Sequence, residues 1–212
     1  MYITVFGAAG NVGSRVVAEA LSRGHDVVAV VRDLARPHSI PAAAKVRCGD
    51  ARIAEDVIKL SAGQDVVISA TRPTPGSESE LISTAKVLLA GLARSGVRLF
   101  VIGGAASLTV PGAAGATVID DPNFPLAIRD LALACKGQLD VCRTEDAVDW
   151  VYLSPPALLK PGMRTGQYRL GADELLVDTQ GNSTISMEDL AVAVLDEIER
   201  PGHHRTRFTV AY

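Results

Sequence analysis

Three glycines near the N-terminus are the clearest sign of chemistry in this sequence. Gly7, Gly10 and Gly13 follow a short apolar run. A strand that ends before Gly7 and a helix that opens near Asn11 would aim free backbone N–H groups at an anion. Gly7 would permit the turn, Gly10 would let a pyrophosphate approach, and Gly13 would let the helix pack closely on the strand. The spacing is G-x-x-G-x-x-G, one residue longer than the dinucleotide fingerprint, so an ordinary glycine turn is the alternative.

The residues after the second apolar run indicate which dinucleotide would bind. In dinucleotide folds, the residues that follow the second strand lie over the adenosine ribose, where an arginine favours a 2′-phosphate and a carboxylate favours a free hydroxyl. Arg32 comes first and Arg36 follows four residues later. We therefore expect NADPH in preference to NADH, although Asp33 favours NADH. The alternative is that both arginines are solvated loop charges.

Elements that could position these residues alternate along the chain. The 212 residues, 48% of them hydrophobic, suit one α/β domain spanning 1–212. Helical periodicity ends at Gly24 and again at Gly96, and a further helix is expected over 187–200. Apolar runs predict buried parallel strands at 2–6, 26–31, 45–48, 65–69, 97–102 and 149–153, with a last strand near 206–211. The expected fold is a doubly wound Rossmann-type parallel sheet flanked by helices.

Two irregular regions are expected to form the substrate side. Residues 110–125 are rich in Gly and Pro and predict a long loop after a strand end, where ligands bind in such sheets. Residues 154–171 read as extended and turn-rich. A small C-terminal extension would therefore complete the fold, with the substrate side contributed by 105–130 and 155–185.

Charge and cysteine content exclude several classes of protein. A net charge of −3 gives no basic surface, so we expect neither nucleic acid nor membrane as a partner. An oligomer is possible but not indicated. No apolar run is long enough to span a membrane, and the chain starts directly in a strand, so we expect a cytoplasmic protein. Cys48, Cys135 and Cys142 have no ligand spacing and are expected to be core residues, and no metal site is expected.

Long motifs carry a resemblance to a known family. The sequences "VFGAAGNVGSRVVAEALSRGHDVVAVVRD", "CGDA", "AGQDVVISATR", "GVRLFVIGGAASL" and "DWVYLSPP" occur in this order over essentially the whole chain. The chain resembles atypical short-chain dehydrogenases/reductases, and within them bacterial NAD(P)H-flavin reductases and the flavin/biliverdin reductase B type. These motifs are specific for fold and cofactor and say little about the substrate.

The resemblance implies a set of cofactor contacts. The glycine turn would contribute Gly7, Ala9, Gly10, Asn11, Val12 and Gly13. Asp50 would lie beside the adenine, and Ala70, Thr71 and Arg72 beside the phosphates and ribose. Gly103 and Gly104 would lie beneath the nicotinamide, with Pro155, Pro156 and Ala157 against its ring.

The chain departs from the wider superfamily at the catalytic pair. No tyrosine has a lysine four residues later, so the usual Tyr-x-x-x-Lys acid–base pair is missing and alcohol or carbonyl substrates are disfavoured. Ser107 and Lys136 are the candidate catalytic residues. The alternative is that Ser107 only shapes a turn and that Lys136 is a solvated lysine on a helix. A flavin or quinone acceptor needs little acid–base help, because its proton can come from water.

Three functions are therefore open. The first is an NAD(P)H-dependent oxidoreductase that transfers hydride to a flavin, a quinone or a similar flat acceptor, with flavin as substrate rather than bound cofactor. The second is a non-catalytic NAD(P)-sensing regulator that resembles NmrA-like proteins. The third is a nucleotide-sugar epimerase or dehydratase, disfavoured because only about 60 residues follow the sixth strand. Fold alone does not choose among them.

Overall fold

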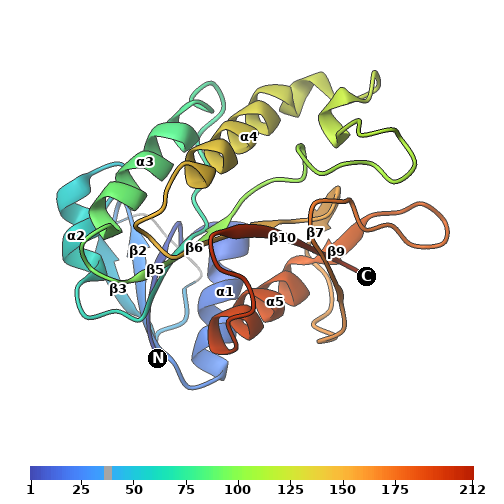
Figure 1. Ribbon diagram of the computed structural model, residues 1–212. Coiled ribbons are helices and arrows are strands. Elements are labelled where there is room, and N and C mark those ends of the chain that lie inside the picture. Colours follow the sequence, from blue (N-terminus) through green and yellow to red (C-terminus); the bar gives the residue numbers. More distant parts are fainter. Residues whose placement is uncertain (36–39) are drawn as a thin grey trace.

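A mostly parallel sheet forms the centre of the computed structural model, which describes residues 1–35 and 40–212 (Figure 1). Within these ranges the sheet has eight strands in the order β3-β2-β1-β4-β5-β6-β10-β8, and only β8 is antiparallel to its neighbour. The strands are β1 (Tyr2–Phe6), β2 (Asp26–Val31), β3 (Lys45–Cys48), β4 (Val66–Ser69), β5 (Arg98–Ile102), β6 (Trp150–Ser154), β8 (Arg169–Gly171) and β10 (Thr206–Ala211). The strand order reverses between β1 and β4, and ligands bind at such switch points, beyond the carboxyl ends of the strands.

Helices cover both faces of the sheet. The helices α1 (Asn11–Ser22) and α5 (Met187–Glu199) pack together on one face. On the other face, α3 (Glu80–Leu92) lies between α2 (Ala54–Ser61) and α4 (Arg129–Arg143) (Figure 1). This is the doubly wound Rossmann-type fold that the sequence predicts.

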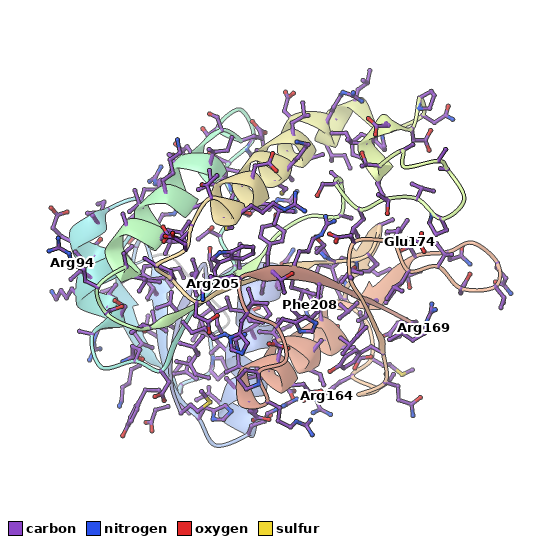
Figure 2. The ribbon with its side chains drawn as sticks, viewed as in Figure 1. Arg94, Arg164, Arg169, Glu174, Arg205 and Phe208 are labelled. Carbon is purple, nitrogen blue, oxygen red and sulfur yellow. The ribbon has the colours of Figure 1, made fainter. Side chains whose placement is uncertain are left out.

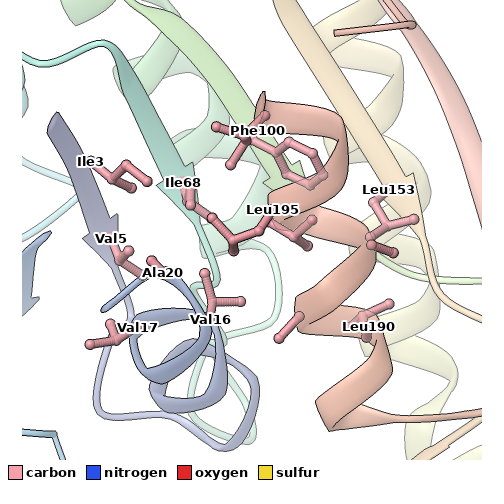
Figure 3. Packing of buried hydrophobic residues seen from close by; sticks show 14 of the residues in the cluster. Ile3, Val5, Val16, Val17, Ala20, Ile68, Phe100, Leu153, Leu190 and Leu195 are labelled. Atoms are coloured by element: carbon pink, nitrogen blue, oxygen red, sulfur yellow. The ribbon is translucent and has the colours of Figure 1, made fainter. Parts of the chain in front are cut away.

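Each face has its own buried core. Beneath α1 and α5, Val5 and Phe100 of the sheet belong to one buried apolar cluster with Val16 and Leu195 of the helices (Figure 3). On the opposite face, α3 and α4 bury a second cluster over the same strands. Burial of this apolar area, at roughly 25 cal/mol per Å², holds the strand ends in place.

The expected strand ranges agree with the structure to within one residue, and the main differences lie in the C-terminal third. The stretch read as merely extended contains β7 (Leu158–Lys160) and β8, and β7 pairs with the unpredicted β9 (Thr184–Ser186) in a separate parallel pair. These strands have three residues each, too few to show a period. The long loop contains the short 3-10 helix η1 (Val118–Asp120), and η2 (Leu126–Ile128) leads into α4.

The expectation that all three cysteines are core residues is wrong for Cys48. This residue ends the edge strand β3, which has a neighbour on one side only, and it is exposed. Cys142 is a buried residue of α4, and Cys135 on the same helix is partly buried. Within the described ranges, no helix is long and apolar enough to cross a membrane.

Candidate cofactor site

The glycine turn between β1 and α1 has the geometry that an anion site requires. Gly7 has φ +79°, and a Cβ there would lie 2.5 Å from the carbonyl oxygen of Ala70. A Cβ at Gly13 would lie 2.2 Å from the carbonyl oxygen of Gly7, so this glycine lets the helix meet the turn. Gly10 precedes α1, and no side chain caps the helix. The first-turn N–H groups of Asn11, Val12 and Gly13 therefore have no partner within the helix and suit a pyrophosphate.

A cavity of about 450 Å³ opens above this turn at the carboxyl edge of the sheet. It extends from the turn across the ends of β2 and β3 to the start of α3, as expected for the adenosine half of a dinucleotide. Eight of the expected cofactor-binding residues line it: Gly7, Ala9, Gly10, Arg32, Asp50, Ala70, Thr71 and Arg72.

Arginine side chains make the cavity suitable for phosphates. Arg32 lines the cavity and pairs with no carboxylate in the described ranges. Arg72 is exposed at the other side of the cavity. The Asp33 carboxylate accepts a hydrogen bond from the backbone of Ala35 at 2.9 Å and so shapes its own turn. Arg36, which we expect to favour the same 2′-phosphate as Arg32, lies outside the described residues.

An ion-pair network closes the end of the cavity where adenine is expected. Asp50 pairs with Arg52 at 2.6 Å, and Arg52 reaches Glu80 at 2.9 Å. The Arg52 guanidinium holds the pKa of the Asp50 carboxyl below its usual range, and Arg32 adds to this effect. Asp50 is therefore an anionic hydrogen-bond acceptor at neutral pH. The sequence analysis did not identify Arg52 and Glu80. The only sequence signal for them is that Arg52 follows β3 and Glu80 opens the helix after β4, and both strands end at this carboxyl edge of the sheet.

The residues expected around the nicotinamide do not line this cavity. Gly103 and Gly104 follow β5, where a Cβ at Gly103 would collide with the Tyr152 ring at 1.9 Å and one at Gly104 would lie 2.9 Å from Cys135 Cβ. Both glycines are thus required by packing. The segment Pro155–Ala157 follows β6, with both prolines buried. These residues share the carboxyl edge of the sheet with the cavity, but lie further along it.

The two candidate catalytic residues lie apart from the cavity. Ser107 Oγ accepts a hydrogen bond of 2.9 Å from Arg207 Nη1, beyond the end of β5. Lys136 is half-exposed on α4 and pairs with Asp140 at 3.0 Å. Lys136 therefore has the environment of a solvated helix lysine, and Ser107 is held by a cation.

No tyrosine near this edge replaces the missing acid–base residue in the described part of the chain. Tyr152 is the buried tyrosine of β6, and burial raises its pKa well above the usual value. Its hydroxyl donates to the carbonyl of Cys135 at 2.9 Å and accepts from Gly104 N–H at 3.3 Å. Burial also raises the pKa of Cys135 to about 11. Both groups stay protonated at neutral pH and are structural.

The glycine turn, the switch-point cavity and the arginines define a Rossmann-type dinucleotide-binding protein. The family model described as "NAD(P)H-binding" matches residues 7–201, and the chain belongs to this family. A curated relative, the uncharacterised protein YwnB of Bacillus subtilis (strain 168), is 38% identical over 217 residues. The match covers 99% of this chain and 98% of YwnB.

Three solved structures match the whole chain, each with a TM-score of 0.90. One, from Burkholderia pseudomallei, is provisionally described as an exported protein and is 40% identical with full coverage of both chains. One from Bacteroides thetaiotaomicron, provisionally assigned as an epimerase, is 39% identical, and the match covers 96% of that chain. One from Streptococcus pneumoniae, provisionally assigned as an NADH-flavin reductase, is 30% identical, and the match covers 99% of that chain. All three share the fold of this chain, and the two that carry an assigned activity, an epimerase and an NADH-flavin reductase, differ in reaction.

Proposed function

We propose that the protein is an NADPH-dependent reductase that transfers hydride to a flavin, a quinone or a similar flat acceptor. The observation that carries this proposal is the cavity of about 450 Å³ above the uncapped start of α1, lined by Arg32. The site fits the cofactor because glycines leave room for a pyrophosphate and arginines supply the countercharge. When bound, NADPH supplies the hydride.

The preference for NADPH over NADH rests on Arg32. A 2′-phosphate would find a guanidinium without a carboxylate partner in the described ranges, and Arg32 can form charge-assisted hydrogen bonds with it. The assignment of the Streptococcus relative names NADH, so the nucleotide preference is a property to measure directly.

The nature of the acceptor follows from the residues that are missing. The Tyr152 side chain is buried and its hydroxyl donates to the carbonyl of Cys135, and Lys136 pairs with Asp140. A flavin or quinone ring accepts hydride without a dedicated side-chain acid, so holding the two rings in contact supplies most of the catalysis. We propose a small molecule of this class as the partner and, because the reaction draws on NADPH, the cytoplasm as its location.

The test measures oxidation of NADPH and NADH at 340 nm against FMN, FAD, riboflavin and a set of quinones. We expect acceptor-dependent turnover, faster with NADPH at limiting cofactor. Cofactor binding without turnover for any acceptor would refute the reductase proposal in favour of a nucleotide sensor. An epimerase returns the hydride to its substrate, so conversion of a nucleotide-sugar without net NADPH oxidation would support that reaction instead.

A further inference from the structure

A buried arginine on the last strand holds the candidate serine. Arg207 of β10 is 6% exposed, and its Nη1 donates to Ser107 Oγ at 2.9 Å and to the Ser107 carbonyl at 3.1 Å. Its Nε donates to Asp173 Oδ1 at 2.8 Å, and Nη2 also contacts this carboxylate. The neighbouring Phe208, labelled in Figure 2, belongs to the core beneath α1 and α5, so Arg207 points to the other face.

The same arginine joins the two segments expected to form the substrate side. Thr109 N–H donates to the Asp173 carbonyl at 2.9 Å, and Leu175 N–H donates to the Thr109 carbonyl at 2.8 Å. Thr109 also forms a β-bridge with Glu174, which Figure 2 labels on the connection between β8 and β9. Arg207 of β10 therefore holds Ser107 itself, and the segment that follows β8 holds Thr109, two residues further along the chain.

The donor that faces Ser107 determines how its hydroxyl can act. A guanidinium has no acceptor, so in this contact Arg207 donates and Ser107 Oγ accepts. The Ser107 proton must then point away from Arg207, and no described residue accepts it. A cation that donates to a hydroxyl oxygen also strengthens that hydroxyl as a donor. The arrangement thus presents one oriented O–H donor beyond the carboxyl end of β5.

We propose that Arg207 is a positioning residue that orients Ser107 to donate a hydrogen bond to a ring carbonyl oxygen of the acceptor. This inference rests on the proposed reductase function and narrows its substrates to flat rings that carry a carbonyl, such as flavins and quinones. Arg207 itself does not touch the acceptor; it acts through Ser107.

The test compares Arg207→Met, Ser107→Ala and the double variant in acceptor kinetics and binding. One hydrogen bond to a neutral ring corresponds to about 2- to 13-fold in KM. We expect each single variant to raise the acceptor KM by this factor, with little change in kcat and unchanged affinity for NADPH. The double variant should equal Ser107→Ala, because Arg207 acts only through that hydroxyl. Quenching of FMN fluorescence by the protein–NADP⁺ complex gives the same comparison without turnover.

The matched control is Arg98→Met, which removes another buried arginine at the opposite end of the sheet, where Arg98 pairs with Glu197 at 2.9 Å. It should lower Tm and leave the acceptor KM unchanged. If Arg207→Met does not fold, Arg207→Lys replaces it, since one ammonium cannot span both Ser107 and Asp173.

The outcomes separate the two proposals. Additive effects in the double variant, or an acceptor KM unaffected by Arg207→Met, would overturn the role of Arg207 while the reductase function stands. Neither binding nor turnover of any acceptor by the unmodified protein would refute the reductase proposal and this inference with it.

Discussion

Replacement of Arg32 by alanine tests the cofactor preference through one side chain. Arg32 lines the cavity and forms no ion pair with a carboxylate in the described ranges, so its guanidinium can pair with a 2′-phosphate. A hydrogen bond to a charged group contributes about 1.5 to 3 kcal/mol, which corresponds to about 10- to 150-fold in Kd. We expect Arg32→Ala to weaken NADPH by this factor and NADH hardly at all.

The assay is calorimetric titration of both nucleotides into each variant at low and high salt. The loss for NADPH should shrink as salt rises, because added ions screen exposed charges. Arg47→Ala is the control, since Arg47 is an exposed arginine of β3 that does not line the cavity. Arg36→Ala should act like Arg32→Ala but more weakly. Equal losses for NADPH and NADH in Arg32→Ala would refute the reasoning and indicate a general structural effect.

Four further substitutions test other parts of the account. Gly10→Val should abolish dinucleotide binding in calorimetry with a near-native circular dichroism spectrum, because the branched side chain would occupy the space of the pyrophosphate; unchanged affinity would contradict the anion site. Neither Ser107→Ala nor Lys136→Ala should abolish turnover, and each should act mainly on KM; a drop in kcat of about 10² or more would instead reveal general acid catalysis. Burial acts to raise the pKa of Asp189, but hydrogen bonds from Thr165, Tyr212 and the Gly166 backbone outweigh it and lower the pKa. A lowered folded pKa contributes stability above the unfolded value of about 3.9, and this stability is lost as the pH falls through the folded pKa. Asp189→Asn should therefore cost about 1 to 3 kcal/mol in urea unfolding at pH 7 and less near pH 3, whereas an equal cost at both values would show that the charge is unimportant.

Local patterns account for the parts of the structure that the sequence predicts well. The glycine turn is encoded within seven residues, so the positive φ of Gly7 and the close packing of Gly13 could be expected from spacing alone. The strands β2 and β4 are nearly continuous apolar runs and stand out for the same reason. Arg32 follows such a strand and could be placed at the cavity from the fold rule.

Contacts between distant segments could not be predicted in this way. Arg52 and Glu80 meet across 28 residues, and Arg207 reaches Ser107 across 100 residues. No local pattern couples such pairs, because the contact exists only after the strands are ordered. The exposure of Cys48 has a similar origin. Cysteine is a residue type that is often buried, and only the strand order places β3 at an edge of the sheet.

The most direct test of the central claim mixes the preformed protein–NADPH complex with one equivalent of FMN in an anaerobic stopped-flow instrument. The claim is that the cavity holds the dinucleotide so that hydride passes directly to a flat ring. The account predicts that absorbance at 340 nm and at 450 nm falls together, with one NADPH oxidised for each flavin reduced, and that Gly10→Val abolishes both changes. A complex that forms but keeps its 340 nm absorbance with FMN and with every quinone tried would contradict the account.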